Sequence, residues 1–119
     1  MWNLHQKAPK RTLNHYLISP MITRIVKLEF QEDRLQAFLD HFEVVKWSVA
    51  SFPGCKGMKL MQDIKNPCVI MTYSHWENEE TLENYRLSPL FQSIWPTIKP
   101  WFSAKPEAWS LREYFDGFQ

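Results

Sequence analysis

The stretch between residues 52 and 91 constrains the fold more than any other part of this chain. A Pro-Gly pair at 53–54 ends the segment before it, and two strand-like runs follow on either side of a short turn at 65–67. The second run ends at Trp76, and Asn78, a favourable N-cap, then opens an amphipathic helix with an acidic first turn. This order of elements predicts an architecture more clearly than any single residue predicts a reaction.

The two runs, residues 56–64 and 68–76, predict a hairpin with a three-residue loop. Such a loop sets the register of the strands. The expected cross-strand pairs are Ile64–Cys68, Met61–Met71, Leu60–Thr72 and Lys59–Tyr73.

The second strand of the hairpin is apolar on both of its faces. Side chains that point to one side are Val69, Met71, Tyr73 and His75, and those that point to the other are Cys68, Ile70, Thr72, Ser74 and Trp76. An antiparallel strand with one face in water would alternate more cleanly, so we expect both faces to be covered.

Hydrophobic periodicity predicts the remaining elements. They are a strand over 22–30, a helix from about 31 to 51, a second helical segment over 78–102 and a last strand over 109–115. The first helix should bury an apolar stripe that includes Phe38, Phe42, Val45 and Val49.

Three prolines occur within the second helical segment. Ser88-Pro89 restarts it in the favoured order of cap and then proline. Pro96 and Pro100 should bend or break it, because proline removes a backbone donor and its ring clashes with the preceding turn.

The resulting order, β-α-β-β-α-β, is that of a ferredoxin-like α+β fold, a four-stranded antiparallel sheet with helices on one face. The helices leave the other face bare, whereas the strand at 68–76 is apolar on that side too. We therefore expect a second copy of the chain to cover it and form a homodimer.

Composition narrows the class of protein. With 119 residues, of which 45% are hydrophobic, the chain fits one domain with a substantial core. A net charge of +1 gives no bias toward nucleic acid. No apolar run suits a signal peptide or a membrane span, so we expect a cytoplasmic protein that binds neither nucleic acid nor membrane.

Residues 1–20 carry basic but no acidic side chains, and we expect this arm to lie against the domain or a partner subunit.

Cysteine and histidine are too dispersed for a disulfide framework or a structural metal site. Cys55 and Cys68 fall at opposite ends of the predicted hairpin, beyond bridging range, so we expect both to be reduced. The four histidines are scattered, and neither CxxC nor HxxxH occurs.

Residues 21–115 resemble the antibiotic biosynthesis monooxygenase (ABM) domain of the dimeric α+β barrel superfamily. The motifs that carry the resemblance are Pro53-Gly54-Cys55, the hairpin with Trp76 and the acidic helix start that runs to Leu82, and the Tyr85–Phe91 motif YRLSPLF. They are more specific for the fold than for any chemistry. The resemblance divides the chain into the basic arm, residues 1–20, and an ABM-like domain, residues 21–119.

This resemblance implies a cofactor-independent monooxygenase that oxidises an aromatic or polycyclic small molecule with molecular oxygen. Such an enzyme needs a base, a donor for an oxyanion and aromatic walls, while the substrate supplies the electrons. No cofactor or metal is expected. The candidate catalytic residues are Trp76, Tyr85 and His75, and the candidate substrate-binding residues are Tyr73, Arg86, Phe91 and Trp95.

We expect these residues to surround an apolar cavity between the sheet and the second helical segment. Its walls should be Trp76, Tyr85, Phe91 and Trp95, with His75, Tyr73 and Arg86 at the rim. Packing in the core or at the strand–helix corner would also explain Trp76, Tyr85 and Trp95, and a structural hydrogen bond would explain His75. Arg86 could simply pair with Glu83, and His41 is expected on the solvent side of the first helix.

Two other functions are compatible with the resemblance. Some relatives degrade haem with an Asn on the first strand and a His late in the second helix. This chain has Lys27 and Trp95 at the corresponding places, so the iron ligand would be missing. The other alternative is a non-catalytic, dimeric small-molecule-binding protein of the same fold.

Overall fold

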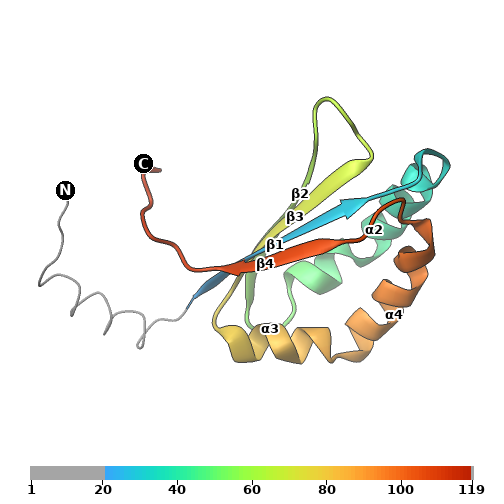
Figure 1. Ribbon diagram of the computed structural model, residues 1–119. Coiled ribbons are helices and arrows are strands. Elements are labelled where there is room, and N and C mark those ends of the chain that lie inside the picture. Colours follow the sequence, from blue (N-terminus) through green and yellow to red (C-terminus); the bar gives the residue numbers. More distant parts are fainter. Residues whose placement is uncertain (1–20, 119) are drawn as a thin grey trace, which may run out of the picture.

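The computed structural model describes residues 21–118, which form a four-stranded antiparallel sheet with its helices on one face (Figure 1). In chain order, the elements are β1 (Ile22–Glu29), the 3-10 turn η1 (Glu32–Arg34), α2 (Leu35–Ala50), β2 (Cys55–Gln62), β3 (Val69–Trp76), α3 (Glu79–Arg86), α4 (Pro89–Ile98), the 3-10 turn η2 (Lys99–Trp101) and β4 (Glu107–Leu111). This order confirms the ferredoxin-like α+β fold. The basic arm, residues 1–20, lies outside the described residues.

The strands lie in the order β2-β3-β1-β4, with β1 antiparallel to both β3 and β4. The hairpin has the expected register, because Met61 faces Met71, Leu60 faces Thr72 and Lys59 faces Tyr73. Pairing stops earlier than expected, at the Gln62–Ile70 pair, so the predicted Ile64–Cys68 pair lies in a longer loop. Cys55 and Cys68 are free thiols at opposite ends of the hairpin.

The helices start where the caps predict. The Asn78 side chain accepts a hydrogen bond from the Thr81 backbone N–H, and Thr81 completes a capping box. Ser88 accepts from the Phe91 N–H at 3.2 Å and begins α4, with Pro89 as its first residue. Pro96 does not break the helix, since α4 continues through it to Ile98. One missing backbone donor this close to the helix end is tolerated, and the backbone tightens only at Pro100, in η2.

The last strand is shorter than the sequence predicts. β4 covers Glu107–Leu111 instead of 109–115, because it pairs only with β1, and Leu111 already faces Thr23 at the start of that strand. Residues 112–118 form no strand and run away from the body as an exposed tail (Figure 1).

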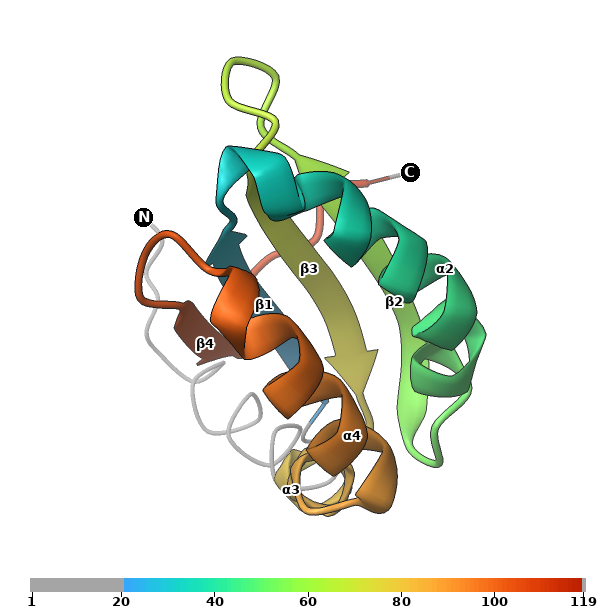
Figure 2. The ribbon, with the colours of Figure 1, turned by 90° about the vertical axis from the view of Figure 1, so that its right-hand side faces the viewer.

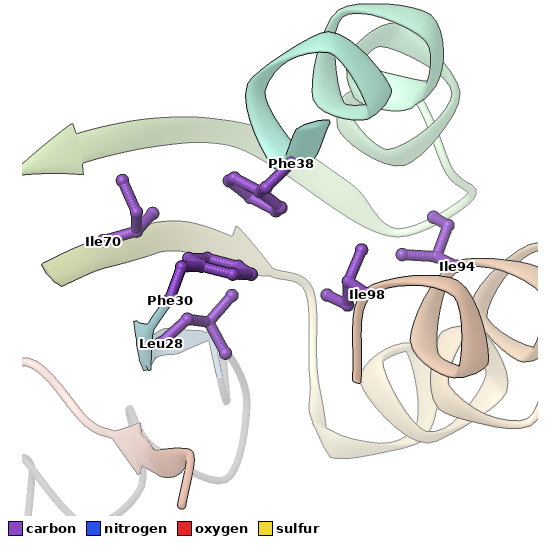
Figure 3. Packing of buried hydrophobic residues seen from close by; sticks show 6 residues of the cluster. All are labelled: Leu28, Phe30, Phe38, Ile70, Ile94 and Ile98. Carbon is purple, nitrogen blue, oxygen red and sulfur yellow. The ribbon is translucent and has the colours of Figure 1, made fainter. Parts of the chain in front are cut away.

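The two faces of the sheet have different surroundings within the chain. α2 and α4 lie side by side over one face, which we call the helix-covered face (Figure 2). The core lies there and consists of Leu28, Phe30, Phe38, Ile70, Ile94 and Ile98 (Figure 3). The opposite face, which we call the outer face, is not covered by any described element. Its apolar residues include Ile25, Met61, Val69, Met71, Tyr73, Trp109 and Leu111.

The apolar stripe of α2 is less buried than expected. Phe38 is 4% exposed, but Phe42, Val45 and Val49 are only half-buried. These three residues pack on the edge of the core and border an open volume. In the described part of the chain, no helix is long and apolar enough to cross a membrane.

Candidate functional site

A cavity of about 380 Å³ lies between the helix-covered face and the helices α2 and α4. It is in the region expected from the sequence, and Trp76, Tyr85, Phe91 and Trp95 all line it. Its volume is in the usual range for small-molecule sites. The lining also includes Arg24, Val26, Leu28, Phe38, His41, Phe42, Val45, Val49, Met58, Thr72, Ser74, Leu82, Arg86, Ile94, Ile98, Pro106, Glu107 and Ala108.

Aromatic rings in sequential contact form one wall of the cavity. Trp76 stacks on Tyr85 with ring centroids 5.1 Å apart, and Tyr85 meets the edge of Phe91 at 5.3 Å. Phe91 in turn stacks on Trp95 at 5.7 Å, and the two rings are within 13° of parallel. All four rings belong to the lining, and aromatic rings are the surface that a flat aromatic ligand prefers.

Trp76 supports this wall from behind. The residue is 1% exposed, and its indole N–H donates to the Ser74 hydroxyl at 3.0 Å. Because the side chain is almost fully covered and its donor is already used, Trp76 has little surface left for a ligand. Its position fixes the ring of Tyr85, which is only partly buried.

Tyr85 places a phenol at the cavity surface. Burial, and secondarily the neighbouring Cys55 thiol, raises the pKa of Tyr85 to about 12. The hydroxyl therefore keeps its proton at neutral pH. No residue within 21–118 makes a hydrogen bond to it, so it is free to donate one to a ligand.

Two guanidinium groups also line the cavity, one from β1 and one from the end of α3. Arg24 donates to the Ser110 hydroxyl at 3.0 Å, and Arg86 pairs with Glu83 at 2.8 Å. Burial, together with the positive charge of Arg86, lowers the pKa of Arg24 from its ordinary value. The expected Arg86–Glu83 pair is confirmed, but Arg86 borders the cavity as well.

His41 is a cavity residue, although the sequence places it on the solvent side of the helix. Its ring meets Trp101 edge-on, with centroids 6.3 Å apart, and it belongs to the cavity lining. The Nε2 atom is enclosed by protein and has no hydrogen-bond partner within the described residues. The sequence does carry a signal for this position, because His41 lies three residues after Phe38 and four before Val45, on the same face of α2.

Tyr73 and His75 lie outside the cavity. Alternate residues of a strand point to opposite faces, and β3 directs Ser74 and Trp76 toward the helices. Tyr73 and His75 therefore lie on the outer face, where their rings meet edge-on at 5.0 Å. His75 also contacts the Thr23 hydroxyl at 3.2 Å. Their expected place at the cavity rim is corrected accordingly.

Several cavity residues were not predicted, and about half of them come from α2 and β1. Phe42, Val45 and Val49 have the spacing of a core stripe, which does not distinguish a core from a cavity wall. Arg24 carries a usable signal, since it is the one charged residue on the otherwise apolar inner side of β1. Residues 21–118 contain no group of three potential metal ligands.

A sequence profile of the protein family described as antibiotic biosynthesis monooxygenase matches residues 21–95. No curated protein matches the chain. Among solved structures, a conserved protein from Methanosarcina mazei Go1 has a TM-score of 0.74 at 19% identity, over 78% of this chain and 92% of that chain. Rv0793 from Mycobacterium tuberculosis has a TM-score of 0.75 at 11% identity, over 82% and 99%.

Another solved structure, described as an antibiotic biosynthesis monooxygenase, has a TM-score of 0.73 at 14% identity, over 77% of this chain and 97% of that chain. At these identities the structural likeness establishes the fold alone.

Proposed function

Because the chain belongs to the antibiotic biosynthesis monooxygenase family, we propose that it is a cofactor-independent monooxygenase acting on a flat aromatic small molecule. The observation that carries the proposal is the cavity, which combines a wall of stacked aromatic rings with a phenol that stays protonated. Its volume of about 380 Å³ suits a ligand of a few fused rings.

A substrate of this kind supplies its own electrons. Loss of a proton from a phenol, or from a carbon beside a carbonyl, gives an anion that reduces molecular oxygen. One oxygen atom then joins the substrate, and the other leaves as water. The aromatic wall excludes water from the anion, and the Tyr85 hydroxyl donates to the oxygen on which charge collects. With its pKa raised to about 12, Tyr85 serves as this donor and not as the base.

His41 is the proton acceptor in this scheme. It is the one imidazole among the described cavity residues, and the other titratable ones are Tyr85, two arginines and Glu107. Glu107 is exposed and lies 4.0 Å from the Lys27 ammonium. An enclosed nitrogen without a partner is costly, and such atoms often have a functional reason. Because Nε2 is enclosed, the imidazole has to turn toward a bound ligand before it can accept the proton.

Oxygen consumption with 1,8-dihydroxyanthrone as substrate tests the proposal. Tyr85→Phe should lower the rate about 100-fold, the usual loss for one oxyanion donor. His41→Gln should lower it by a similar factor of about 100. Tyr73→Phe removes the same hydroxyl from the outer face and should leave the rate unchanged.

Two results would contradict this function. Equal rates for the wild type and both cavity variants would show that the oxidation occurs without the site. Tight binding of the anthrone with no oxygen uptake would support the non-catalytic binding protein instead.

We also propose that the chain forms a homodimer through the outer face. Ile25 and Trp109 face each other across the β1–β4 pair there, and Trp109 is 41% exposed in the single chain. An apolar sheet face of this extent is typical of an interface. Light scattering should give the mass of a dimer, and Trp109→Glu should give a monomer. A wild-type monomer at micromolar concentration would contradict the proposal.

A further inference from the structure

Arg24 is a partly buried cation without an anionic partner. It extends from β1 onto the helix-covered face, and its cross-strand neighbours are Ser74 on β3 and Ser110 on β4, both neutral. Its side-chain hydrogen bond goes to the Ser110 hydroxyl. No Asp or Glu among residues 21–118 forms an ion pair with it, and residues 1–20 and 119 contain neither Asp nor Glu.

Arg86 adds a second positive charge at the same place. It lies close enough to disfavour the charged form of Arg24, and both side chains line the cavity. Glu83 compensates Arg86 on the solvent side, at 2.8 Å, but it makes no ion pair with Arg24. Glu107 also lines the cavity and pairs with Lys27. The three cations, Arg24, Arg86 and Lys27, outnumber the two carboxylates, Glu83 and Glu107, and leave an excess positive charge at the apolar cavity.

A simpler explanation is that Arg24 merely covers apolar surface with its aliphatic stem. That explanation does not require a second guanidinium beside it, since neighbouring like charges destabilise each other. An anion bound between the two groups would remove this cost. Guanidinium groups bind carboxylates with paired, charge-assisted hydrogen bonds, which makes a carboxylate the best-matched occupant.

We propose that Arg24 and Arg86 form a carboxylate-binding subsite at the rim of the cavity, and that the ligand is a flat aromatic carboxylate. Its ring system lies against Tyr85, Phe91 and Trp95, and its carboxylate lies at the two guanidinium groups. The inference deepens the proposed function, because it names the chemical class of the substrate of that same site.

Equilibrium binding of matched probes tests the subsite without any turnover. The probes are anthraquinone-2-carboxylate and the neutral anthraquinone-2-carboxamide, which have nearly the same shape, and the readout is calorimetry on the full chain. The carboxylate should bind at least about tenfold more tightly, as expected for a charge-assisted pair. Arg24→Gln should abolish this preference, and Arg86→Gln should reduce it.

Lys59→Gln is the matched control. It removes one positive charge from the outer face, where the Lys59 ammonium lies 5.8 Å from the centre of the Tyr73 ring. The preference for the carboxylate should persist in this variant, and its loss would mean that overall charge, and not the subsite, governs binding. Thermal melting of each variant verifies that it is folded.

The inference is overturned if the wild type binds both probes equally or binds neither. It is also overturned if folded Arg24→Gln keeps the full preference. These outcomes are separate from those of the proposed function. A preference for the carboxylate without oxygen uptake would support the subsite and contradict the monooxygenase. Oxygen uptake without the preference would support the monooxygenase and contradict the subsite.

Discussion

The space between the sheet and its helices has two ends made of similar side chains, but only one end is filled. At the core end, Phe30 and Phe38 are 1% and 4% exposed, and their rings stack with centroids 4.3 Å apart (Figure 3). At the cavity end, Phe42, Tyr85 and Trp95 are only half-buried and border open volume.

The difference follows from how the chain connects the helices. At the core end both helices are tied to the same point, because the Gln31 N–H donates to the Trp101 carbonyl at 2.9 Å and Phe30 bridges to Phe102. At the other end, α2 leads to the edge strand β2, while α4 starts from α3, so the two helices connect to different elements there. Aromatic residues at helical spacing therefore fill a core or line a cavity according to where the helices are tied.

A pair of matched substitutions on α2 gives the largest expected effect. Phe38→Ala should lower the free energy of unfolding by about 3–5 kcal/mol, because its ring is only 4% exposed and stacks on Phe30, although it also reaches the lining of the cavity. Phe42→Ala, one turn later, should cost about half as much, since its ring already borders open volume. Denaturant melts of both variants measure this. Equal losses would mean that the two ends are packed alike.

A substitution at Gly54 tests how tightly the chain packs at the cavity end, where the residues before β2 meet the start of α3. Its φ of +90° is unfavourable for other residues, and a Cβ there would clash with the Cβ of Thr81 in the capping box. Gly54→Ala should therefore cost about 2–3 kcal/mol. Gly57→Ala serves as the comparison, because its φ is also positive but its Cβ would meet nothing within 4 Å. Gly57→Ala should lower the free energy of unfolding by less. Equal losses for the two variants would show that the Thr81 side chain moves aside without cost.

Alkaline pH should lower the free energy of unfolding, because Tyr85 at the cavity end loses its proton. The folded pKa is about 12, whereas the unfolded value is about 10, so above pH 10 the unfolded chain loses this proton first. The stabilisation is complete below pH 10 and falls as pH rises to 12, by about 2 kcal/mol. Tyr85→Phe should remove this part of the alkaline loss. Identical pH–stability curves for wild type and variant would show that the phenol is not desolvated.

The smallest expected effect concerns the start of α3. Asn78→Ala removes the acceptor for the Thr81 N–H and should cost about 1 kcal/mol, the usual value for a lost N-cap. Because α3 borders only the cavity end, the structure should open there first. Hydrogen exchange should show faster opening of α3 than of α2, and uniform acceleration would contradict this separation.

Much of the fold could be predicted because its signals are local. The Asn78 and Ser88 caps fix where α3 and α4 begin, and strand alternation fixes the pairing of Met61 with Met71. The ends of β4 and of the hairpin pairing could not be predicted so well. They depend on how far a partner strand extends, which is information held elsewhere in the chain.

The features of the candidate site also divide into those that the sequence predicts and those that it does not. The sequence by itself determined the β-α-β-β-α-β order, the capped helices and the aromatic residues of the second helical segment, because periodicity and capping act over a few residues. Only the tertiary structure decided that Tyr85, Arg24 and His41 border one cavity. Strand alternation already placed Tyr73 and His75 on the face opposite Trp76. How α2 and α4 are placed at the cavity end depends on contacts between distant segments, and no local pattern records it.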